Sequence, residues 1–265
     1  LKVNSPIKKA NDKLVLDNII AAAKANNDRL VSIMFDLSGA NATGTMVDDI
    51  KNYWQEIVDE YGLNNNTNNH LLTYTQKPIV AIWGVGFNRS DNYDLEDVQE
   101  LIDFFKDDPV YGGCSVLLGV PRSWRTPGEG DAVNDAQLLE IIKSADIVHP
   151  WTVGRYTSLS GADSYRSTIS ADKEWCDNED LLYMPVVFPG FSWQNLKKSQ
   201  GVEADLNSIP RLEGDFMWRQ FYNAISENAE TIYVAMFDEM DEGTCIFKVD
   251  NNPPSSNLTQ FTNYE

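Results

Sequence analysis

The feature that most constrains the fold is a regular alternation of short apolar runs with amphipathic segments. Each run is nearly continuous and rich in β-branched residues, as expected of strands buried on both faces. The runs are LVSIMF (30–35), PIVAIWGV (78–85), CSVLLGV (114–120), DIVHPW (146–151), LYMPVVF (182–188) and TIYVAMF (231–237). Between most of them, apolar residues three and four apart predict helices over 14–25, 47–62, 95–107, 135–145 and 214–229. Strands that alternate with helices indicate parallel βαβ units.

These units favour a (β/α)8 TIM barrel. No GxGxxG or GxxxxGK[ST] motif follows any run, so neither a dinucleotide fold nor a P-loop is supported. Only six strands are found where such a barrel has eight. Either two strands escape the apolar pattern or the first two βα units are missing from this chain. Residues 1–12 read as a loop leading into a helix, so we favour the second explanation. Residues 1–250 would then supply strands 3 to 8 of one catalytic-type domain, and residues 251–265 an extended C-terminal segment.

The composition of the chain disfavours some classes of binding partner. Forty acidic and 21 basic residues give a formal net charge of −19, which disfavours nucleic acids and anionic membranes. No stretch approaches the roughly 18 consecutive apolar residues of a membrane-spanning helix. The three cysteines allow at most one disulfide and one free thiol. N-glycosylation sequons in loop-like stretches predict a secreted or cell-surface glycoprotein, and they lie at Asn41, Asn65, Asn88 and Asn257.

Aromatic and polar residues follow the predicted strands at their carboxyl ends, where the loops of a parallel α/β fold converge. Tryptophan and tyrosine offer flat faces for stacking on sugars, and Asp or Arg can bind hydroxyl groups. Taken singly, each aromatic is more typical of core packing, but their common position favours a carbohydrate site. The predicted substrate-binding residues are Asp36, Trp83, Trp124, Arg125, Trp151, Arg155, Tyr156, Trp193 and Asp238.

Four carboxylates occupy five positions after the last run, in the sequence FDEMDEG. Cleavage of a glycosidic bond requires one group that protonates the departing oxygen and a second that assists at the ring. Glu239 and Glu242 are the natural pair, because crowding raises the pKa of one carboxyl group while the other stays ionised. A cation site for an ion such as Ca²⁺ and plain surface charge are the alternatives.

The segment FDEMDEGT resembles the E-x-x-E-G-T signature of glycoside hydrolase family 99. The segments GDFMWRQFYNAI, PVVFPGFSW, HPWTVGRY and GVPRSWRT are similar to the 71/99-like glycosidases of the same clan, in the same order along the chain. Family 99 has Trp-His between the two glutamates, where this chain has Met240 and Asp241.

This resemblance implies a retaining glycosidase that acts on a mannan-like or related polysaccharide, without a metal or an organic cofactor. It assigns Glu239 as the base that deprotonates the sugar's 2-hydroxyl group and Glu242 as the acid and later base. A hypothesis from another class is a non-catalytic carbohydrate-binding or structural module of an extracellular glycoprotein assembly. In that case a protein partner, rather than a missing N-terminal segment, would complete the barrel.

Overall fold

The computed structural model describes residues 6–26, 28–38, 45–63, 70–89, 93–246, 250–257 and 259–262. Its elements, in chain order, are α1 (Pro6–Ala25), β1 (Ile33–Asp36), α2 (Met46–Tyr61), β2 (Thr73–Tyr74), β3 (Lys77–Trp83), α3 (Leu95–Asp107), β4 (Ser115–Pro121), α4 (Gln137–Lys143), β5 (Ile147–Trp151), α5 (Leu159–Asn178), β6 (Leu182–Tyr183), β7 (Val186–Val187), α6 (Gln194–Ser199), the 3₁₀ helix η1 (Leu212–Gly214), α7 (Asp215–Ser226) and β8 (Tyr233–Val234).

The chain divides into two compact units. Unit 1 comprises Leu1–Val148 and Asp180–Leu182, and unit 2 comprises His149–Glu179 and Tyr183–Glu265. None of the helices within the described ranges combines the length and the apolar character that a bilayer crossing requires.

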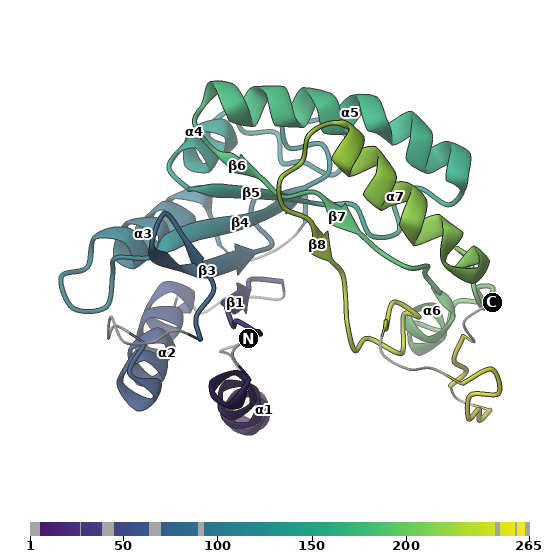
Figure 1. The fold of residues 1–265 in the computed structure, drawn as a ribbon, viewed down its shortest axis with the longest axis horizontal. Helices are drawn as coiled ribbons and strands as arrows, with labels where there is room; N and C mark the ends of the chain where they lie inside the picture. The colour runs from purple at the N-terminus through teal and green to yellow at the C-terminus, as the bar shows by residue number, and fades with distance from the viewer. Residues whose placement is uncertain are drawn as a thin grey trace. The chain divides into compact units, whose positions relative to one another are not determined.

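The sheet is mostly parallel, which confirms the predicted α/β class (Figure 1). The strand order is β1-β3-β4-β5-β6, with β2 antiparallel on β3, and β7 pairs in parallel with β8. Apart from the short β2, the strands therefore follow their order in the sequence. Among the described strands, β1 pairs only with β3 and β8 only with β7, so no closed barrel was detected.

The predicted strand 182–188 is divided into β6 and β7 around Pro185. Proline has no N–H to donate to a neighbouring strand, which accounts for the interruption. Its carbonyl still accepts a hydrogen bond from the Tyr233 N–H at 2.9 Å, and the Val187 carbonyl accepts one from the Ala235 N–H at 2.9 Å. These bonds fix the register of β8 on β7 as far as Ala235, the first residue of the acidic turn (residues 235–243).

The core of unit 1 is an aromatic cluster between the sheet and two helices. Phe35 of β1 stacks on Phe105 of α3 with ring centroids 5.9 Å apart, and Trp54 of α2 meets Phe105 edge to face at 5.5 Å. The indole N–H of Trp54 donates to the carbonyl of Tyr111 at 2.8 Å. These contacts hold β1 and β3 in a parallel register that places Asp36 opposite Trp83.

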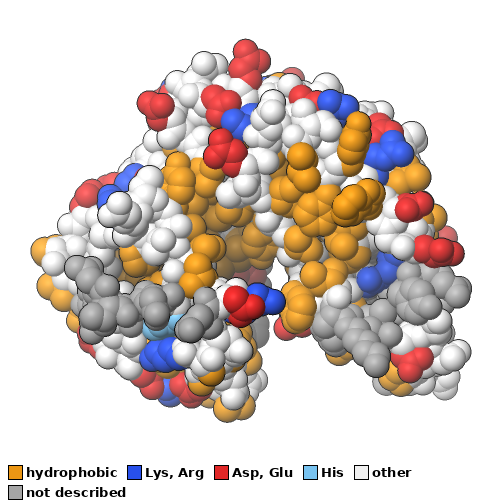
Figure 2. Space-filling model, viewed as in Figure 1, with side chains coloured by type: hydrophobic (Ala, Val, Ile, Leu, Met, Phe, Trp, Pro, Cys, Tyr) orange, Lys and Arg blue, Asp and Glu red, His pale blue; other side chains and the backbone are white. Residues whose placement is uncertain are grey.

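In unit 2, helices α5 and α7 lie side by side (Figure 1). The amide of Asn223 on α7 donates to the Ala162 carbonyl of α5 at 3.0 Å. The outer face of α7 carries Trp218, Tyr222 and Ile225, which are 73%, 58% and 62% exposed. Hydrophobic side chains accordingly gather on the surface over α7 (Figure 2).

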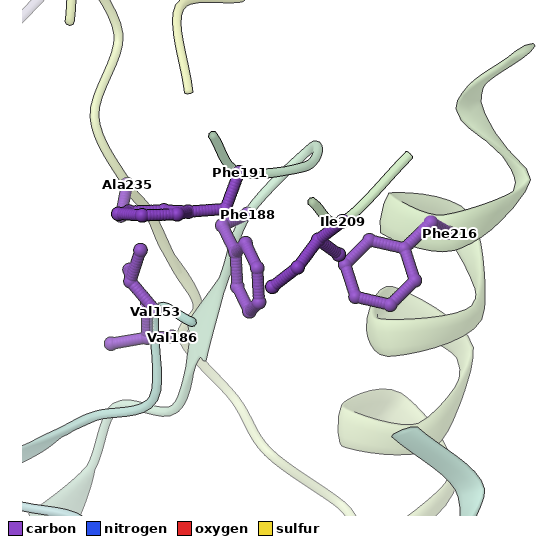
Figure 3. Close-up of a cluster of buried hydrophobic side chains, with 7 residues drawn as sticks. All are labelled: Val153, Val186, Phe188, Phe191, Ile209, Phe216 and Ala235. Atoms are coloured by element: carbon purple, nitrogen blue, oxygen red, sulfur yellow. The ribbon is translucent and has the colours of Figure 1, made fainter. Parts of the chain in front are cut away.

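A hydrophobic cluster packs α7 against the ends of β7 and β8 (Figure 3). Phe188, directly after β7, meets Phe216 of α7 edge to face with centroids 5.3 Å apart. Ile209 lies between the two rings in the close-up, on the β7–α7 loop. The cluster holds in place the segment that follows β7, through Phe188, Phe191 and Ile209.

Helices α2, α3, α4 and α7 lie where apolar periodicity predicts them. The prediction of a loop over residues 1–12 was wrong from Pro6 onward, because α1 begins there. The first turns of α1 are polar, and they are held by ion pairs of Lys9 with Glu56 and Lys13 with Glu60 of α2. Helix α5 was missed altogether.

Candidate active site

The acidic turn, residues 235–243, follows β8 directly. The Glu239 N–H donates to the Met236 carbonyl at 3.2 Å, and the Gly243 N–H donates to the Met240 carbonyl at 3.1 Å. Glu239 and Glu242 are half-buried, whereas Asp238 and Asp241 are exposed. The predicted pair is therefore the pair that the fold withdraws in part from water.

The environment of Glu242 favours its protonated form. Burial, followed by the negative charges of Glu239 and Asp241, raises its pKa from 4.5 to about 7. Desolvation and nearby like charges both disfavour an ionised carboxyl group. Glu242 therefore retains its proton in part at neutral pH, as a general acid must.

Main-chain hydrogen bonds fix both glutamates. The Ser192 N–H donates to the Glu242 carbonyl at 2.7 Å. The Thr244 and Cys245 N–H groups donate to the Glu239 carbonyl at 3.1 and 2.9 Å. The carboxylate of Glu239 accepts the Asp241 N–H at 3.0 Å through Oε1, which orients the side chain.

A pocket of about 520 Å³ opens beside the acidic turn. Its walls come from α6, the turn and the C-terminal segment, and its lining residues are Asn195, Leu196, Lys198, Ser199, Glu239, Asp241, Glu242 and Thr259. The Asn195 amide donates to the carbonyls of Asp241 and Gln260 at 3.1 and 2.8 Å, joining the turn to the C-terminal segment. Carboxylate, amide and hydroxyl groups in one pocket of this volume are suited to a polyhydroxylated ligand.

Three predicted aromatic residues of unit 2 are partly buried and pack against the hydrophobic cluster. The ring of Trp193 lies 4.4 Å from that of Phe191, and Trp193 directly follows Ser192, which binds Glu242. Trp151 meets His149 edge to face at 6.0 Å. The main-chain hydrogen bond from Ser192 to Glu242 therefore connects the segment that carries Trp193 to the acidic turn.

Tyr156 behaves as a core residue. Its hydroxyl group donates to Gln220 Oε1 at 2.9 Å, and its ring lies 5.4 Å from Phe188 and 6.0 Å from Phe216. Burial raises its pKa above the usual range. Arg155, by contrast, is exposed, with its N–H donated to the Thr152 carbonyl at 3.0 Å.

The other four predicted substrate-binding residues lie in unit 1. Trp83 is half-buried and close against Gly119 of β4, since an added Cβ there would lie 2.3 Å from Trp83 Cδ1. Asp36 accepts the Ser38 N–H at 2.8 Å through Oδ1. Trp124 is fully buried and Arg125 half-buried, so the packing interpretation is favoured for Trp124.

Sequence reasoning did not propose Gln220, Arg211 or Asn195 as structural supports of the site. Gln220 Nε2 donates to the carbonyls of Phe188 and Phe216 at 2.8 and 2.9 Å, and its Oε1 accepts the Phe188 N–H at 3.1 Å. The only sequence signal was a glutamine at a core-facing position of α7. Arg211 lies in an irregular loop, and Asn195 lies in the short helix α6 (Gln194–Ser199), so in neither place does a long apolar periodicity mark a supporting residue.

No group of three or more His, Cys, Asp or Glu side chains is arranged to hold a metal ion within the described ranges. The cation alternative for FDEMDEG therefore gains no support. All three cysteines are buried and without a disulfide. The sequon residues Asn88 and Asn257 are exposed, whereas Asn41 and Asn65 lie outside the described residues.

Comparison with known proteins identifies solved structures with a similar fold. No family model and no curated protein matches the chain. The GH99 endo-alpha-mannosidase from Bacteroides thetaiotaomicron in complex with bis-tris-propane matches with a TM-score of 0.64 at 16% identity, over 100% of this chain and 72% of that one. This chain has a GH99-like fold. A second structure of that enzyme matches with a TM-score of 0.59 at 17% identity, over 93% of this chain and 63% of that one.

The structural likeness confirms the resemblance to family 99 at the level of the fold. In this chain, the acidic turn follows β8, the last described strand, as the sequence analysis predicted. The chain spans less than two thirds of the length of the second mannosidase structure.

Proposed function

We propose that the protein is a retaining glycoside hydrolase that cleaves a mannan-like or related polysaccharide. The observation that carries the proposal is the pairing of Glu239 with Glu242, whose pKa is raised to about 7, at the wall of a pocket. A carboxyl group that is partly protonated at neutral pH beside a second carboxylate is the arrangement that glycosidic cleavage requires. The GH99-like fold supports the same reaction class.

In the mechanism we propose, Glu239 removes the proton of the sugar's 2-hydroxyl group and the 2-oxygen attacks the anomeric carbon. The bond to the departing oxygen breaks, and Glu242 gives that oxygen its proton. Glu242 then accepts a proton from water, whose oxygen opens the epoxide-like intermediate, while Glu239 returns its proton to the 2-oxygen. Two displacements at one carbon retain its configuration.

The residues of unit 2 that we propose to hold the sugar are Trp193 and Trp151. Trp83 and Asp36 of unit 1 stay predictions from the sequence. The bis-tris-propane named with the related mannosidase is a polyhydroxylated amine. The carboxylate, amide and hydroxyl groups that line the pocket beside the acidic turn would suit a ligand of this chemistry.

A (β/α)8 barrel has eight βα units, two more than the predicted strands 3 to 8 would supply. We propose that either the same protein or a partner supplies these two units. We further propose secretion with N-glycans at Asn88 and Asn257, which mass spectrometry of the secreted protein would detect.

The experiment that tests the function is hydrolysis of mannan-type and xylan-type oligosaccharides. Glu242→Gln should lower turnover by about two to four orders of magnitude without unfolding the chain. Glu230→Gln, an exposed glutamate outside the pocket, is the matched control and should keep full activity. Unchanged turnover in Glu242→Gln would refute the assignment of Glu242 as the general acid.

A non-catalytic module in a protein assembly is the second candidate function. The exposed apolar stripe Trp218, Tyr222 and Ile225 favours it, since surface patches of this kind mark interaction sites. In that case Trp218→Ser should release the chain from its assembly in sedimentation experiments, whereas Glu242→Gln should leave the assembly intact. An assembly that survives Trp218→Ser argues against this face as an interface.

A further inference from the structure

Arg211 is a buried cation on the loop between β7 and α7. Only 7% of its surface is exposed. Its Nη2 donates to the main-chain carbonyls of Gly243 at 2.8 Å and Cys245 at 2.7 Å. In the part of the chain that the structure describes, no ion pair joins Arg211 to a carboxylate. A buried charge without an ionic partner is costly, so its presence calls for a physical reason.

The two carbonyls that Arg211 binds belong to the segment that fixes both glutamates. Gly243 directly follows Glu242 in the chain. The Cys245 N–H, together with that of Thr244, donates to the Glu239 carbonyl. One guanidinium nitrogen thus bridges the outer end of the acidic turn, and charged donors make the stronger hydrogen bonds of this kind.

Arg211 is itself held by the loop that follows β7. Phe191 and Ile209 exchange two main-chain hydrogen bonds, at 2.9 and 2.8 Å, two residues before Arg211. Gly190 gives the side chain room, because a Cβ at that position would lie 3.0 Å from Arg211 Cγ and 2.7 Å from the Ile209 carbonyl oxygen. A continuous path of contacts therefore runs from the loop after β7 through Arg211 to the acidic turn.

The backbone after Arg211 supports a fixed arrangement. Leu212 and Glu213 adopt left-handed conformations with φ of 52° and 53°. Residues other than glycine adopt this region at a cost, and they keep it only where the surroundings determine it.

We propose that Arg211 is a positioning residue, whose buried guanidinium fixes the turn that carries Glu239 and Glu242. The inference rests on the proposed function, in which those two glutamates act on the sugar. It adds a residue that contacts neither the substrate nor either carboxyl group. Its effect is on turnover, because displacement of a catalytic group by about 1 Å can cost about 100-fold in rate.

The test compares Arg211→Met and Arg211→Lys with Arg219→Met. Arg219 lies on α7 and pairs with Asp163, so its replacement removes the same charge away from the turn. Arg211→Met should lower kcat about 10- to 100-fold and leave KM within about threefold, while Arg211→Lys should recover part of kcat. Arg219→Met should keep kcat within about twofold.

Two further measurements separate positioning from general stability. In Arg211→Met, the fall of activity at alkaline pH should move to lower pH, because a loosened turn exposes Glu242 to water. The amide protons of Thr244 and Cys245 should also exchange with solvent at least about tenfold faster than in Arg219→Met. If Arg211→Met does not fold, Arg211→Lys should show both changes in smaller measure.

Unchanged kcat, or unchanged amide exchange, in a folded Arg211 variant would overturn the proposal. Wild-type protein that hydrolyses no glycan would instead count against the proposed function. Amide exchange at Thr244 and Cys245 would still decide whether Arg211 fixes the turn.

Discussion

Replacing Glu242 with glutamine should stabilise the protein at alkaline pH. Its pKa is about 7 in the folded protein against an ordinary value of 4.5. Folding therefore binds this proton more tightly, and the associated stability is fully present below pH 4.5 and lost as the pH rises through 7. Above pH 7 the ionised carboxylate opposes folding, and glutamine removes that cost.

The magnitude follows from the size of the pKa change. One pKa unit corresponds to about 1.4 kcal/mol, so the change from 4.5 to about 7 sets an upper limit of about 3 kcal/mol. Glu242 is only half-buried, and solvent screening reduces this to about 1–2 kcal/mol. For a chain of this size each kcal/mol shifts Tm by about 2–4 °C.

Thermal unfolding followed by circular dichroism at pH 5 and pH 8 measures the effect. Glu242→Gln should melt about 2–8 °C above the wild type at pH 8 and close to it at pH 5. Glu230→Gln, the exposed control, should shift Tm equally at both pH values. If Glu242→Gln is less stable than the wild type at pH 8, or differs from it equally at both pH values, the reasoning about burial is refuted.

Four further outcomes follow from the structure. Gln220→Leu leaves the Phe188 main-chain groups unsatisfied, and should lower the free energy of unfolding by about 2–4 kcal/mol in urea titrations; a loss below about 0.5 kcal/mol would contradict the network. Gly119→Ala should displace the indole of Trp83, costing about 1–3 kcal/mol in the same titration and weakening oligosaccharide binding measured by calorimetry. Because burial raises the pKa of the Cys114 thiol to about 12, this residue should react with thiol reagents only after unfolding, and rapid labelling of native protein would count against that burial. Chelators and added Ca²⁺ should both leave Tm unchanged, and a rise in Tm with Ca²⁺ would instead favour a cation site at FDEMDEG.

The strands could be predicted from the sequence because burial on both faces leaves a continuous apolar run. The run PIVAIWGV, for example, contains most of β3, and TIYVAMF contains β8 and the start of the acidic turn. The position of the glutamates after the last strand followed from the same pattern. Physical periodicity was therefore enough to predict the α/β class and the order of the main parallel strands.

Helix α5 shows where periodicity fails. Its buried residues are Ala162, Ile169, Asp172 and Cys176, a mixture of small and polar side chains that leaves no apolar stripe to recognise. Asp172 accepts a hydrogen bond from the Tyr183 hydroxyl group at 3.3 Å, so a tertiary contact, rather than hydrophobicity, accounts for its burial. Such contacts are not visible in a single sequence.

The supports of the candidate site were hidden for a related reason. Arg211 and Asn195 act on main-chain carbonyls far away in sequence, and any polar residue of a loop or of a short helix such as α6 could do the same. Trp124 was predicted as a binding residue from its place after a strand, yet it is fully buried. Position along the chain identifies the end of the sheet where a residue lies, but not whether its ring faces solvent.

Hydrolysis of two aryl glycosides that differ only in the leaving group tests the central claim most directly. A good leaving group departs without a proton, so Glu242→Gln should keep much of the wild-type rate on the activated glycoside and lose about 100- to 10,000-fold on the poor one. Glu239→Gln should fail on both, because it removes the base. Equal losses on the two substrates in Glu242→Gln, or full activity in Glu239→Gln, would contradict the assignment of this pair.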